Sequence, residues 1–295
     1  MPASGISSTA PAPLAERPPA AAPVACTRAL PATCLGGAWQ MAIDSWLLDQ
    51  GQPALRLYRW LRPCLSLGRH QTRLPEHWQE LAASGRIELV RRPCGGAAVL
   101  RGGELRCALG WPEPPGPRGE AYRQACRWLQ EAFAAFGQPL QFGDQPAGLT
   151  AASCFATRTA ADLVHGDGSK RIGSAQLWRA GCLLQHGSIQ LAPDGQLWRQ
   201  VFGRLPPRLP PLPARPGELE DALMAAADRW SVLPPLRQQP LSAAELTAIA
   251  GRLAQGRLEP ASGAAAGADS PAAGSPTSPE ASIERTTWGS ASPRG

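Results

Sequence analysis

Two residues of the sequence have side chains suited to acyl transfer, Cys154 and Lys170. Lys170 is the only lysine among 29 lysines and arginines, so arginine serves wherever a positive charge alone is needed. A lysine ammonium is a compact charge that can stabilise one developing negative oxygen. A cysteine thiolate is a strong nucleophile, and a nearby ammonium lowers the pKa of a thiol. The pair suggests acyl transfer, although one of eight cysteines could equally fill space in a core.

A double glycine, Gly95-Gly96, separates two predicted strands. Without a Cβ atom the backbone can adopt positive φ and approach a ligand closely, so its N–H groups can line a narrow groove. A tight turn is the simpler interpretation when the two glycines are taken alone.

The prolines divide the chain into a compact part and its flanks. The 295 residues can form one large or two small domains, and the 32 prolines crowd positions 2–31, 206–216 and 260–293. We therefore predict a disordered Ala/Pro-rich leader over 1–35, a compact domain over 36–203, a Pro-rich linker with C-terminal helices over 204–259, and a disordered tail over 260–295.

Composition argues against several classes of protein. The cysteines form no CxxC pair, no His/Cys cluster has metal-ligand spacing, and nothing resembles a secretory leader, so we expect a cytoplasmic protein with reduced thiols and no metal. No apolar run is long enough to span a bilayer, and no membrane partner is expected. The net charge of +6 comes without a basic stripe interleaved with aromatics, so no nucleic-acid partner is expected either.

Hydrophobic periodicity predicts an alternation of helices and strands. Helical spacing and end signals indicate helices at 37–50, 74–83, 122–136, 217–230 and 242–258. Alternation predicts that strands 54–60 and 64–68 pair, that Gly102-Gly103 turns a hairpin from 97–100 into 104–111, and that 170–179 and 182–191 form a second hairpin.

Several ordered motifs together carry a family resemblance. They are Met41-Ala42-Ile43-Asp44, Ser66-Leu67-Gly68 with Gln71, the run from Arg91 to Leu100, the run from Gly168 to Gln176, and Leu184-Gln185-His186-Gly187-Ser188-Ile189. Over Gly37 to Val201 the chain resembles the biotin/lipoate protein ligase catalytic domain family, and within it the cysteine-dependent octanoyltransferases and lipoate-protein ligase A. The resemblance implies an α/β (α+β) fold of the biotin-ligase and class II synthetase type, with a mixed, largely antiparallel sheet flanked by helices.

The resemblance also implies an activity and a set of site residues. An octanoyl group would pass from octanoyl acyl carrier protein through a Cys154 thioester to a lysine of a lipoyl domain or glycine-cleavage H protein, without a cofactor. Lys170 would contact the acyl carbonyl. A tunnel for the eight-carbon chain would be lined by Arg91, Arg92, Gly95, Gly96, Ala97, Val99, Gly173, Ser174 and Ala175.

Four positions depart from the family pattern. Cys94 stands where the family usually has serine or threonine, Ala97 where it has glycine or arginine, Arg101 where it has histidine, and Arg106 where it often has a small polar residue. An imidazole exchanges a proton near pH 7 and an arginine does not. Either that histidine is dispensable here, or His165 or His186 covers its role, or turnover has been lost.

The histidines and arginines near the motifs have simpler interpretations as well. His165 could help deprotonate Cys154, but an exposed loop histidine is the plainer expectation. His186 is expected to be structural, within the second hairpin. Arg91 and Arg92 could meet the phosphate of the carrier's pantetheine arm, although arginines on a strand surface are common in this chain.

Three alternatives remain open from the sequence. An amidotransferase that moves the acyl group between lipoyl-type domains would use the same two residues. An ATP-dependent lipoate-protein ligase would require ATP and Mg²⁺, and Cys154 would then be incidental. A degenerate member would only bind acyl-domain partners. Lys170 is the only lysine of this chain. Apart from Lys170 and the amino terminus, no amine of this chain could be acylated stably, so the acceptor lysine must lie on another chain.

Overall fold

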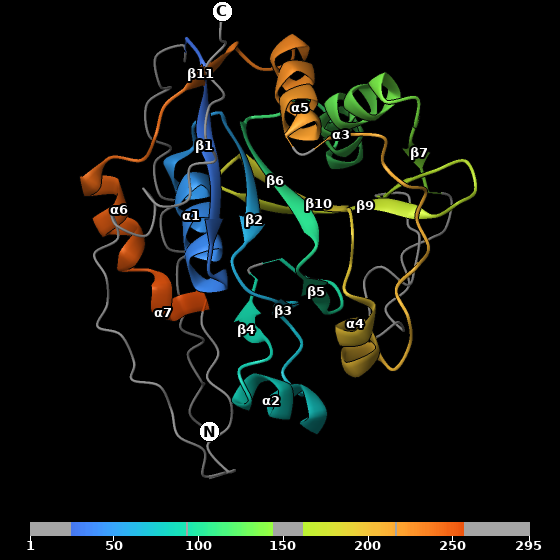
Figure 1. The fold of residues 1–295 in the computed structure, drawn as a ribbon. Coiled ribbons are helices and arrows are strands. Elements are labelled where there is room, and N and C mark those ends of the chain that lie inside the picture. The colour runs from blue at the N-terminus through green and yellow to red at the C-terminus, as the bar shows by residue number, and fades with distance from the viewer. Residues whose placement is uncertain (1–24, 93, 144–161, 216, 257–295) are drawn as a thin grey trace, which may run out of the picture.

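Two β-sheets and seven helices make up the part of the chain that the structure describes (Figure 1). The computed structural model describes residues 25–92, 94–143, 162–215 and 217–256. Eight strands form a sheet in the order β11-β1-β2-β6-β10-β9-β8-β7, and three form a smaller sheet in the order β4-β3-β5. In the large sheet β1 pairs in parallel with β2 and β11, and the other pairings are antiparallel. The predicted fold class, a mixed and largely antiparallel sheet flanked by helices, is confirmed.

The elements have the following bounds. The strands are β1 (Thr27–Leu35), β2 (Ala54–Trp60), β3 (Cys64–Leu67), β4 (Glu88–Arg91), β5 (Val99–Arg101), β6 (Glu104–Pro112), β7 (Gln141–Phe142), β8 (Leu163–Val164), β9 (Lys170–Arg179), β10 (Cys182–Gln190) and β11 (Leu236–Gln238). The helices are α1 (Gly37–Gln50), α2 (Glu76–Ala83), α3 (Arg118–Ala135), α4 (Gly195–Phe202), α5 (Glu218–Arg229), α6 (Ala243–Ala250) and α7 (Leu253–Gly256). None of these helices is long and apolar enough to cross a membrane.

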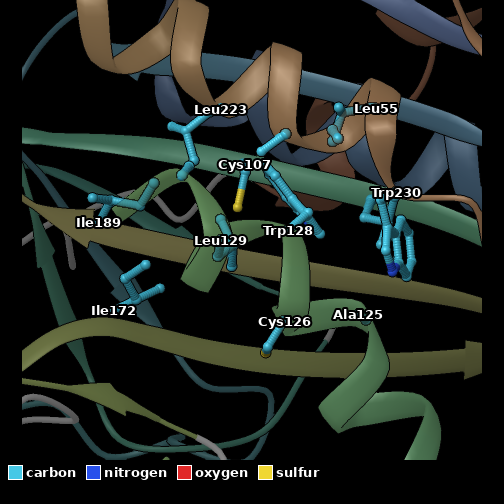
Figure 2. Close-up of a cluster of buried hydrophobic side chains, with 14 of the residues drawn as sticks. Leu55, Cys107, Ala125, Cys126, Trp128, Leu129, Ile172, Ile189, Leu223 and Trp230 are labelled. Carbon is cyan, nitrogen blue, oxygen red and sulfur yellow. The ribbon is translucent and has the colours of Figure 1, made fainter. Parts of the chain in front are cut away.

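Strand alternation gives the large sheet two different faces. On one face, odd-numbered residues of β2, β6 and β10 pack with α3 and α5 in an apolar core, part of which Figure 2 shows around Cys107, Leu129 and Leu223. On the other face, even-numbered residues of the same strands pack against α1 in a smaller cluster that includes Met41, Leu48 and Tyr58. Since side chains alternate along a strand, any polar residue at an even position of β6 or β10 lies on the side of the large sheet that carries α1.

Helix α1 is seated closely against the small sheet. The Gly37 N–H donates to Oε2 of Glu88 at 2.8 Å. A Cβ at Gly37 would lie 2.7 Å from Cγ1 of Val90, closer than real contacts allow, so glycine is needed for this approach. Gly51 ends the helix in the left-handed conformation at φ 61°. The N-terminal end of α1 thus contacts the small sheet, while Met41 and Leu48 pack on the even-numbered face of the large sheet.

The predicted leader is wrong over Thr27–Leu35, which form β1 inside the large sheet. Pro31 in this stretch argues against a strand from sequence alone, because proline cannot donate to a ladder. The register of β1 against β2 shifts between Leu30 and Thr33, and this irregularity accommodates the proline. Residues 1–24 and 257–295 lie outside the described residues, and the remaining domain boundaries stay predictions.

Two predicted strand pairings are also wrong. β2 pairs with β1 and β6 of the large sheet, whereas β3 pairs with β4 and β5 of the small sheet. Likewise β5 belongs to the small sheet and β6 to the large one, so Gly102-Gly103 carries the chain between sheets. In both places a short turn joins neighbouring strands, which local patterning cannot distinguish from a hairpin. The predicted hairpin of β9 and β10 is confirmed.

Candidate functional site

A cavity of about 290 Å³ lies where the small sheet meets strands β6, β9 and β10. One wall is formed by the loop between β4 and β5 with the adjoining strand, namely Arg92, Cys94, Gly95, Gly96, Val99 and Arg101. The opposite wall comes from the large sheet, namely Arg106, Gly173, Ser174, Ala175, Gln176, His186 and Ser188. The structure therefore brings together most of the predicted substrate-binding residues.

Arg92 shapes the glycine loop of this cavity. Its guanidinium is buried and donates to the carbonyl oxygens of Ser66 at 2.7 Å, Ala97 at 2.7 Å and Gly95 at 3.0 Å. Gly96 adopts φ +96°, and its carbonyl oxygen would lie 1.9 Å from a Cβ at Gly68. Only glycine fits either position, so the loop is held close to the Ser66-Leu67-Gly68 strand end.

Two predicted binding residues lie beside the cavity and not in its wall. Arg91 donates from Nη1 to the carbonyl oxygens of Gln71 at 2.7 Å and Gly68 at 3.0 Å, so it fixes a loop. Ala97 contributes the carbonyl that Arg92 binds. The predicted role of Arg91 and Arg92 toward a phosphate is not supported by these contacts, because their donors serve backbone carbonyls.

A buried chain of polar contacts runs from α1 through β10 to the glycine loop. Nε2 of His186 lies 2.8 Å from Oδ2 of Asp44, and His186 lines the same cavity as Cys94. The three residues are respectively 3%, 0% and 4% exposed. Oδ2 of Asp44 accepts from the Tyr58 hydroxyl at 2.8 Å, and Oδ1 faces Nη1 of Arg56 at 3.1 Å. The carboxylate thus has a partner at each oxygen.

These contacts set the protonation of the three groups. Burial by itself would raise the pKa of the Asp44 carboxyl, but the charges of Arg56 and His186 lower it to about 2. Burial by itself would lower the pKa of His186, but Asp44 raises it above its ordinary value. Burial would raise the pKa of the Cys94 thiol, whereas the neighbouring His186 and the charges of Arg92 and Arg106 lower it to about 7. His186 was predicted to have only a structural role within the hairpin. The structure places it in the cavity wall, beside the buried Asp44.

Arg101 lies in the cavity wall, at the position where the family pattern has histidine. Its Nη1 donates to Oε1 of Glu104 at 3.1 Å, and its guanidinium is 5.8 Å from the Trp60 ring centroid. Burial lowers the pKa of Arg101 to about 10, and the neighbouring charge of Arg106 acts in the same direction. Within the described residues Nε of Arg101 has no hydrogen-bond acceptor. The side chain therefore presents a positive charge and one available donor at the cavity.

His165 is buried at the end of β8 and is not an exposed loop histidine. Its Nε2 accepts from Nε of Arg171 at 2.8 Å, and Arg171 also donates to the carbonyl of Gln190 at 2.7 Å. Burial lowers the pKa of His165, and the charge of Arg171 lowers it further. These contacts make His165 a neutral acceptor that helps to join β8, β9 and β10.

Lys170 begins β9 and is positioned by the turn that precedes it. The His165 N–H donates to the carbonyl of Ser169 at 2.9 Å, and the Gly168 N–H donates back to the carbonyl of His165 at 2.8 Å. The ammonium lies 2.9 Å from Oδ2 of Asp162, and both side chains are buried. Lys170 is not among the described residues of the cavity wall. Cys154, the predicted nucleophile, lies outside the described residues.

Asp44 and Cys94 are the residues of this site that the sequence interpretation missed as chemistry. A signal for Asp44 was present, because Gln40 and Asp44 fall on the same helical face as Gly37, Met41 and Leu48. All five residues are buried, so the buried face of α1 includes two polar side chains. The core-facing side of a helix is normally apolar. In the described ranges no group of three or more His, Cys, Asp and Glu side chains could hold a metal ion.

Comparison with known proteins identifies the family to which the sequence is similar. Residues 37–208 match the model of the lipoyl protein ligase A/B catalytic domain. An octanoyltransferase LipM of Symbiobacterium thermophilum is 38% identical over 189 residues, which are 59% of this chain and 68% of that relative. Other octanoyltransferases of the same name are 32–37% identical, and the chain spans 62–65% of their length.

Solved structures show the same fold at low sequence identity. Lipoate-protein ligase A bound with ATP superposes with a TM-score of 0.65 at 16% identity, over 79% of this chain and 95% of that one. A bipartite lipoate protein ligase of Thermoplasma acidophilum, described with its E2 lipoyl domain, gives a TM-score of 0.60 at 16% identity, over 78% and 92% of the two chains. The comparisons confirm the predicted family, fold class and enzyme class, an acyltransferase of protein lipoylation.

Proposed function

Because the chain belongs to the lipoyl protein ligase A/B catalytic domain family, we propose that it is an octanoyltransferase that works in the cytoplasm. The donor is octanoyl acyl carrier protein, and the acceptor is a lysine of a lipoyl domain or of glycine-cleavage H protein. The octanoyl group travels as a thioester on a cysteine of the enzyme. No cofactor takes part in this route.

The cavity between the glycine loop and β9–β10 is the observation that carries the proposal. Its volume of about 290 Å³ is just below the ~300–1,000 Å³ typical of ligand sites, which suits one short linear chain. Gly95, Gly96, Gly173 and Ala175 bring backbone close to that chain. Burying its methylenes contributes roughly 5 kcal/mol, at about 0.8 kcal/mol for each, so the cavity can measure chain length.

Three positive groups surround the cavity and suit the carbonyl end of the acyl chain. Arg92, Arg101 and Arg106 are all buried in its wall. Arg92 uses its donors on the glycine loop, whereas Nε of Arg101 has no acceptor in the described part of the chain. A carbonyl oxygen gains negative charge as a nucleophile attacks, and cations in a dry site stabilise that charge.

In the proposed route Cys154 is the nucleophile and Lys170 stabilises the oxyanion. The Cys154 thiolate attacks the donor carbonyl carbon, the bond from that carbon to the donor sulfur breaks, and the carrier leaves as a free thiol. The amine of the acceptor lysine then attacks the acyl-enzyme, an amide forms, and the cysteine thiol is regenerated. The buried ion pair of Lys170 with Asp162 fixes the position of the ammonium group.

The acceptor is proposed from the family and from one structural relative. The Thermoplasma acidophilum ligase is described together with its E2 lipoyl domain. We extend that partner class, a lipoyl domain, to this chain. Because Lys170 is the only lysine here, the modified lysine belongs to the partner.

The test uses the full chain, octanoyl carrier protein and a lipoyl domain, without ATP. We expect intact-protein mass spectrometry to show one octanoyl group on the enzyme that hydroxylamine removes, followed by octanoylation of the lipoyl domain. Lys170→Ala should slow acyl-enzyme formation about 10²-fold or more, the usual cost of losing an oxyanion donor. Cys154→Ala should slow transfer to the lipoyl domain, and Arg199→Ala on the exposed end of α4 should not.

Other outcomes would point to the alternatives. Transfer of free octanoate or lipoate that requires ATP and Mg²⁺ would identify a ligase. Transfer from an octanoylated domain to a second domain, with no reaction from the carrier, would identify an amidotransferase. Binding of the lipoyl domain without any transfer would identify a degenerate family member.

A further inference from the structure

A second cavity lies beside the cavity of about 290 Å³ described above, which we call the acyl cavity. The second cavity has a volume of about 260 Å³, and its walls are the turn between β2 and β3, the turn between β5 and β6, and the N-terminal end of α4 (Figure 1). We propose that it receives the phosphopantetheine arm of the carrier protein while the octanoyl group occupies the acyl cavity. This inference rests on the proposed function for the identity of the donor.

Arg101 connects the two cavities, because it is the one described residue that lines both. Its Nη1 donates to Oε1 of Glu104 at 3.1 Å, and the same oxygen accepts from Nε1 of Trp60 at 3.1 Å. Oε2 of Glu104 accepts from the hydroxyl of Ser188. Trp60 lines the second cavity and Ser188 lines the acyl cavity, so one buried carboxylate joins the two walls. A ligand that extends from one cavity into the other therefore passes Arg101.

The wall of the second cavity has the chemistry that the arm requires. The arm is a narrow chain of methylene and methyl groups joined by amides, and it carries the thioester sulfur at one end and a phosphate at the other. Ligand pockets for such chains are mostly apolar with a few polar groups. The apolar side chains of this wall are Trp60, Pro63, Leu100, Leu197 and Trp198.

The charged groups of the wall favour an anion at its outer end. Arg62 lines the second cavity and is exposed to solvent. The carboxylate of Asp194 also lies in the wall, but its Oδ1 accepts from the N–H groups of Gln196 at 2.9 Å and Leu197 at 3.0 Å and so caps α4. With Arg101 the wall has two guanidinium groups and one carboxylate. Arginine is the side chain best suited to bind a phosphate, so we assign the phosphate of the arm to Arg62.

Exposed leucines beside the second cavity suit the protein that carries the arm. Leu61, Leu205 and Val232 are the large hydrophobic side chains that are exposed in the described part of the chain. Leu61 is 60% exposed and lines the cavity. Leu205 is 58% exposed, and its Cδ2 would lie 3.7 Å from a Cβ at Gly195, next to the capping residue of α4. Exposed apolar side chains that gather at one place mark a contact surface for a protein partner.

The role of Arg62 is tested by single-turnover acylation of the full chain with octanoyl carrier protein, without ATP. We expect Arg62→Ala to raise the half-saturating concentration of the carrier roughly tenfold, the effect of losing one charge-assisted contact, and to leave the maximal rate unchanged. Arg62→Lys should recover part of the loss. Octanoyl pantetheine, which has the arm without its phosphate, should be used equally well by Arg62→Ala and the unaltered chain.

The matched control for charge is Arg199→Ala. Arg199 is exposed in the last turn of α4 and is not among the described residues that line either cavity. This variant should keep the half-saturating concentration of the unaltered chain. An equal increase in both variants would mean that net charge attracts the carrier, and it would refute a phosphate site at Arg62.

The cavity itself is tested by filling it. Ala192 is exposed and lines the second cavity, and its N–H donates to the carbonyl of Gly103 at 2.9 Å, a bond that a larger side chain leaves intact. Ala192→Phe should raise the half-saturating concentration of both octanoyl carrier protein and octanoyl pantetheine roughly tenfold or more, because the side chain takes the place of the arm. Reaction with p-nitrophenyl octanoate, which has no arm, should not change. Ala83→Phe at the exposed end of α2 is the control.

Three results would overturn the arm site. Ala192→Phe and Arg62→Ala could both leave the carrier kinetics unchanged. Ala192→Phe could slow p-nitrophenyl octanoate as much as octanoyl pantetheine, which would mean that it disturbs the acyl cavity. It could also raise the half-saturating concentration of the lipoyl domain and not that of the carrier, which would make the second cavity an acceptor site.

A binding measurement separates this inference from the proposed function. If the unaltered chain takes no octanoyl group from the carrier, the proposed function fails, and isothermal titration then tests the arm site alone. Carrier protein with the arm should bind at least tenfold more tightly than carrier protein without it, and Ala192→Phe should remove this preference. Equal affinities for the two forms of the carrier would refute the arm site.

Discussion

Cys107 and Cys94 are both almost fully buried beside the central sheet, at 2% and 4% exposure, yet their thiols have very different acidities. Burial raises the pKa of Cys107 to about 12. At Cys94 the effect of burial is outweighed by His186 and two arginines, and the pKa falls to about 7. Cys107 projects toward α3 among Leu129 and other apolar side chains, as Figure 2 shows. Cys94 meets the face of β10 that looks toward α1.

Strand alternation gives the large sheet a structural face toward α3 and a chemical face toward α1. His186 and Gly187 are adjacent on β10, and only the first faces α1 and Asp44. Apart from Gln185, which bonds the Ala125 carbonyl, the face toward α3 is largely apolar and contributes buried apolar area. The face toward α1 carries buried ions that are costly unless each is paired. A one-residue change of register in β10 would exchange the two faces and separate His186 from Asp44.

Removing the carboxylate at the centre of the chemical face should have the largest effect on stability. Asp44→Ala leaves Arg56 without its buried partner and Tyr58 without its acceptor. We expect the free energy of unfolding to fall by about 3–5 kcal/mol, the usual cost of removing one member of a buried pair. Urea denaturation followed by circular dichroism measures it.

The matched control is Asp49→Ala on the same helix. Asp49 is paired with Arg252 at 2.5 Å and with Arg179, but its side chain is 28% exposed. Surface pairs contribute about 0–1 kcal/mol, so this variant should lose no more than that. Equal losses in the two variants would contradict the idea that the α1 face depends on its buried ions.

Thiol reactivity should differ between Cys94 and Cys182 by about 10²-fold at pH 7. Their pKa values are about 7 and about 11, so about half of Cys94 is thiolate and only roughly one part in 10⁴ of Cys182 is. The lower intrinsic nucleophilicity of the more acidic thiol, with a Brønsted coefficient of ~0.4–0.5, offsets part of this ratio. Because a lowered thiol pKa gives more thiolate as pH rises through 7, the Cys94 rate should climb there and level off above.

The measurement is site-resolved alkylation by iodoacetamide between pH 5 and pH 9, with peptide mass spectrometry. Both residues are 4% exposed, so access is comparable and the rate ratio reports acidity. A Cys94 rate that rises tenfold for each pH unit throughout this range would mean an ordinary buried thiol. His186→Gln should produce that behaviour.

The elements that local pattern determines were predictable, and those that depend on distant partners were not. The β9–β10 hairpin follows from alternation and from a tight turn at Ala180-Gly181, where both φ values are positive. β1 was missed because its sequence contains Pro31 and because its ladder partners, β2 and β11, lie later in the chain. The sequence of residues 27–35 alone does not indicate that either strand pairs with them.

The residues of the candidate site also fall into two groups, those that local motifs predict and those that only the fold brings together. The glycine loop and the Gly173-Ser174-Ala175 segment were predicted from motifs, and they line the cavity. The pairing of Asp44 with His186 was not predicted, because α1 and β10 meet only in the folded sheet. The sequence did show Cys94 as a departure from the family pattern. Its acidity depends on three side chains from separate elements, which no local motif contains. The predicted roles of Cys154 and Lys170 remain proposals.

The smallest of these effects should come from the structural face. A Cβ at Gly187 would lie 2.4 Å from Sγ of Cys107 and 3.8 Å from Cγ2 of Ile172. Gly187→Ala should therefore cost about 1–3 kcal/mol of unfolding free energy through overpacking. Cys107→Ala removes the sulfur, so the double variant should lose less than the sum of the two single losses in urea denaturation. Gly119→Ala on α3, with open space at its Cβ, is the control and should not destabilise. Strict additivity would show that the α3 face yields to an extra methyl, and it would weaken the contrast between the faces.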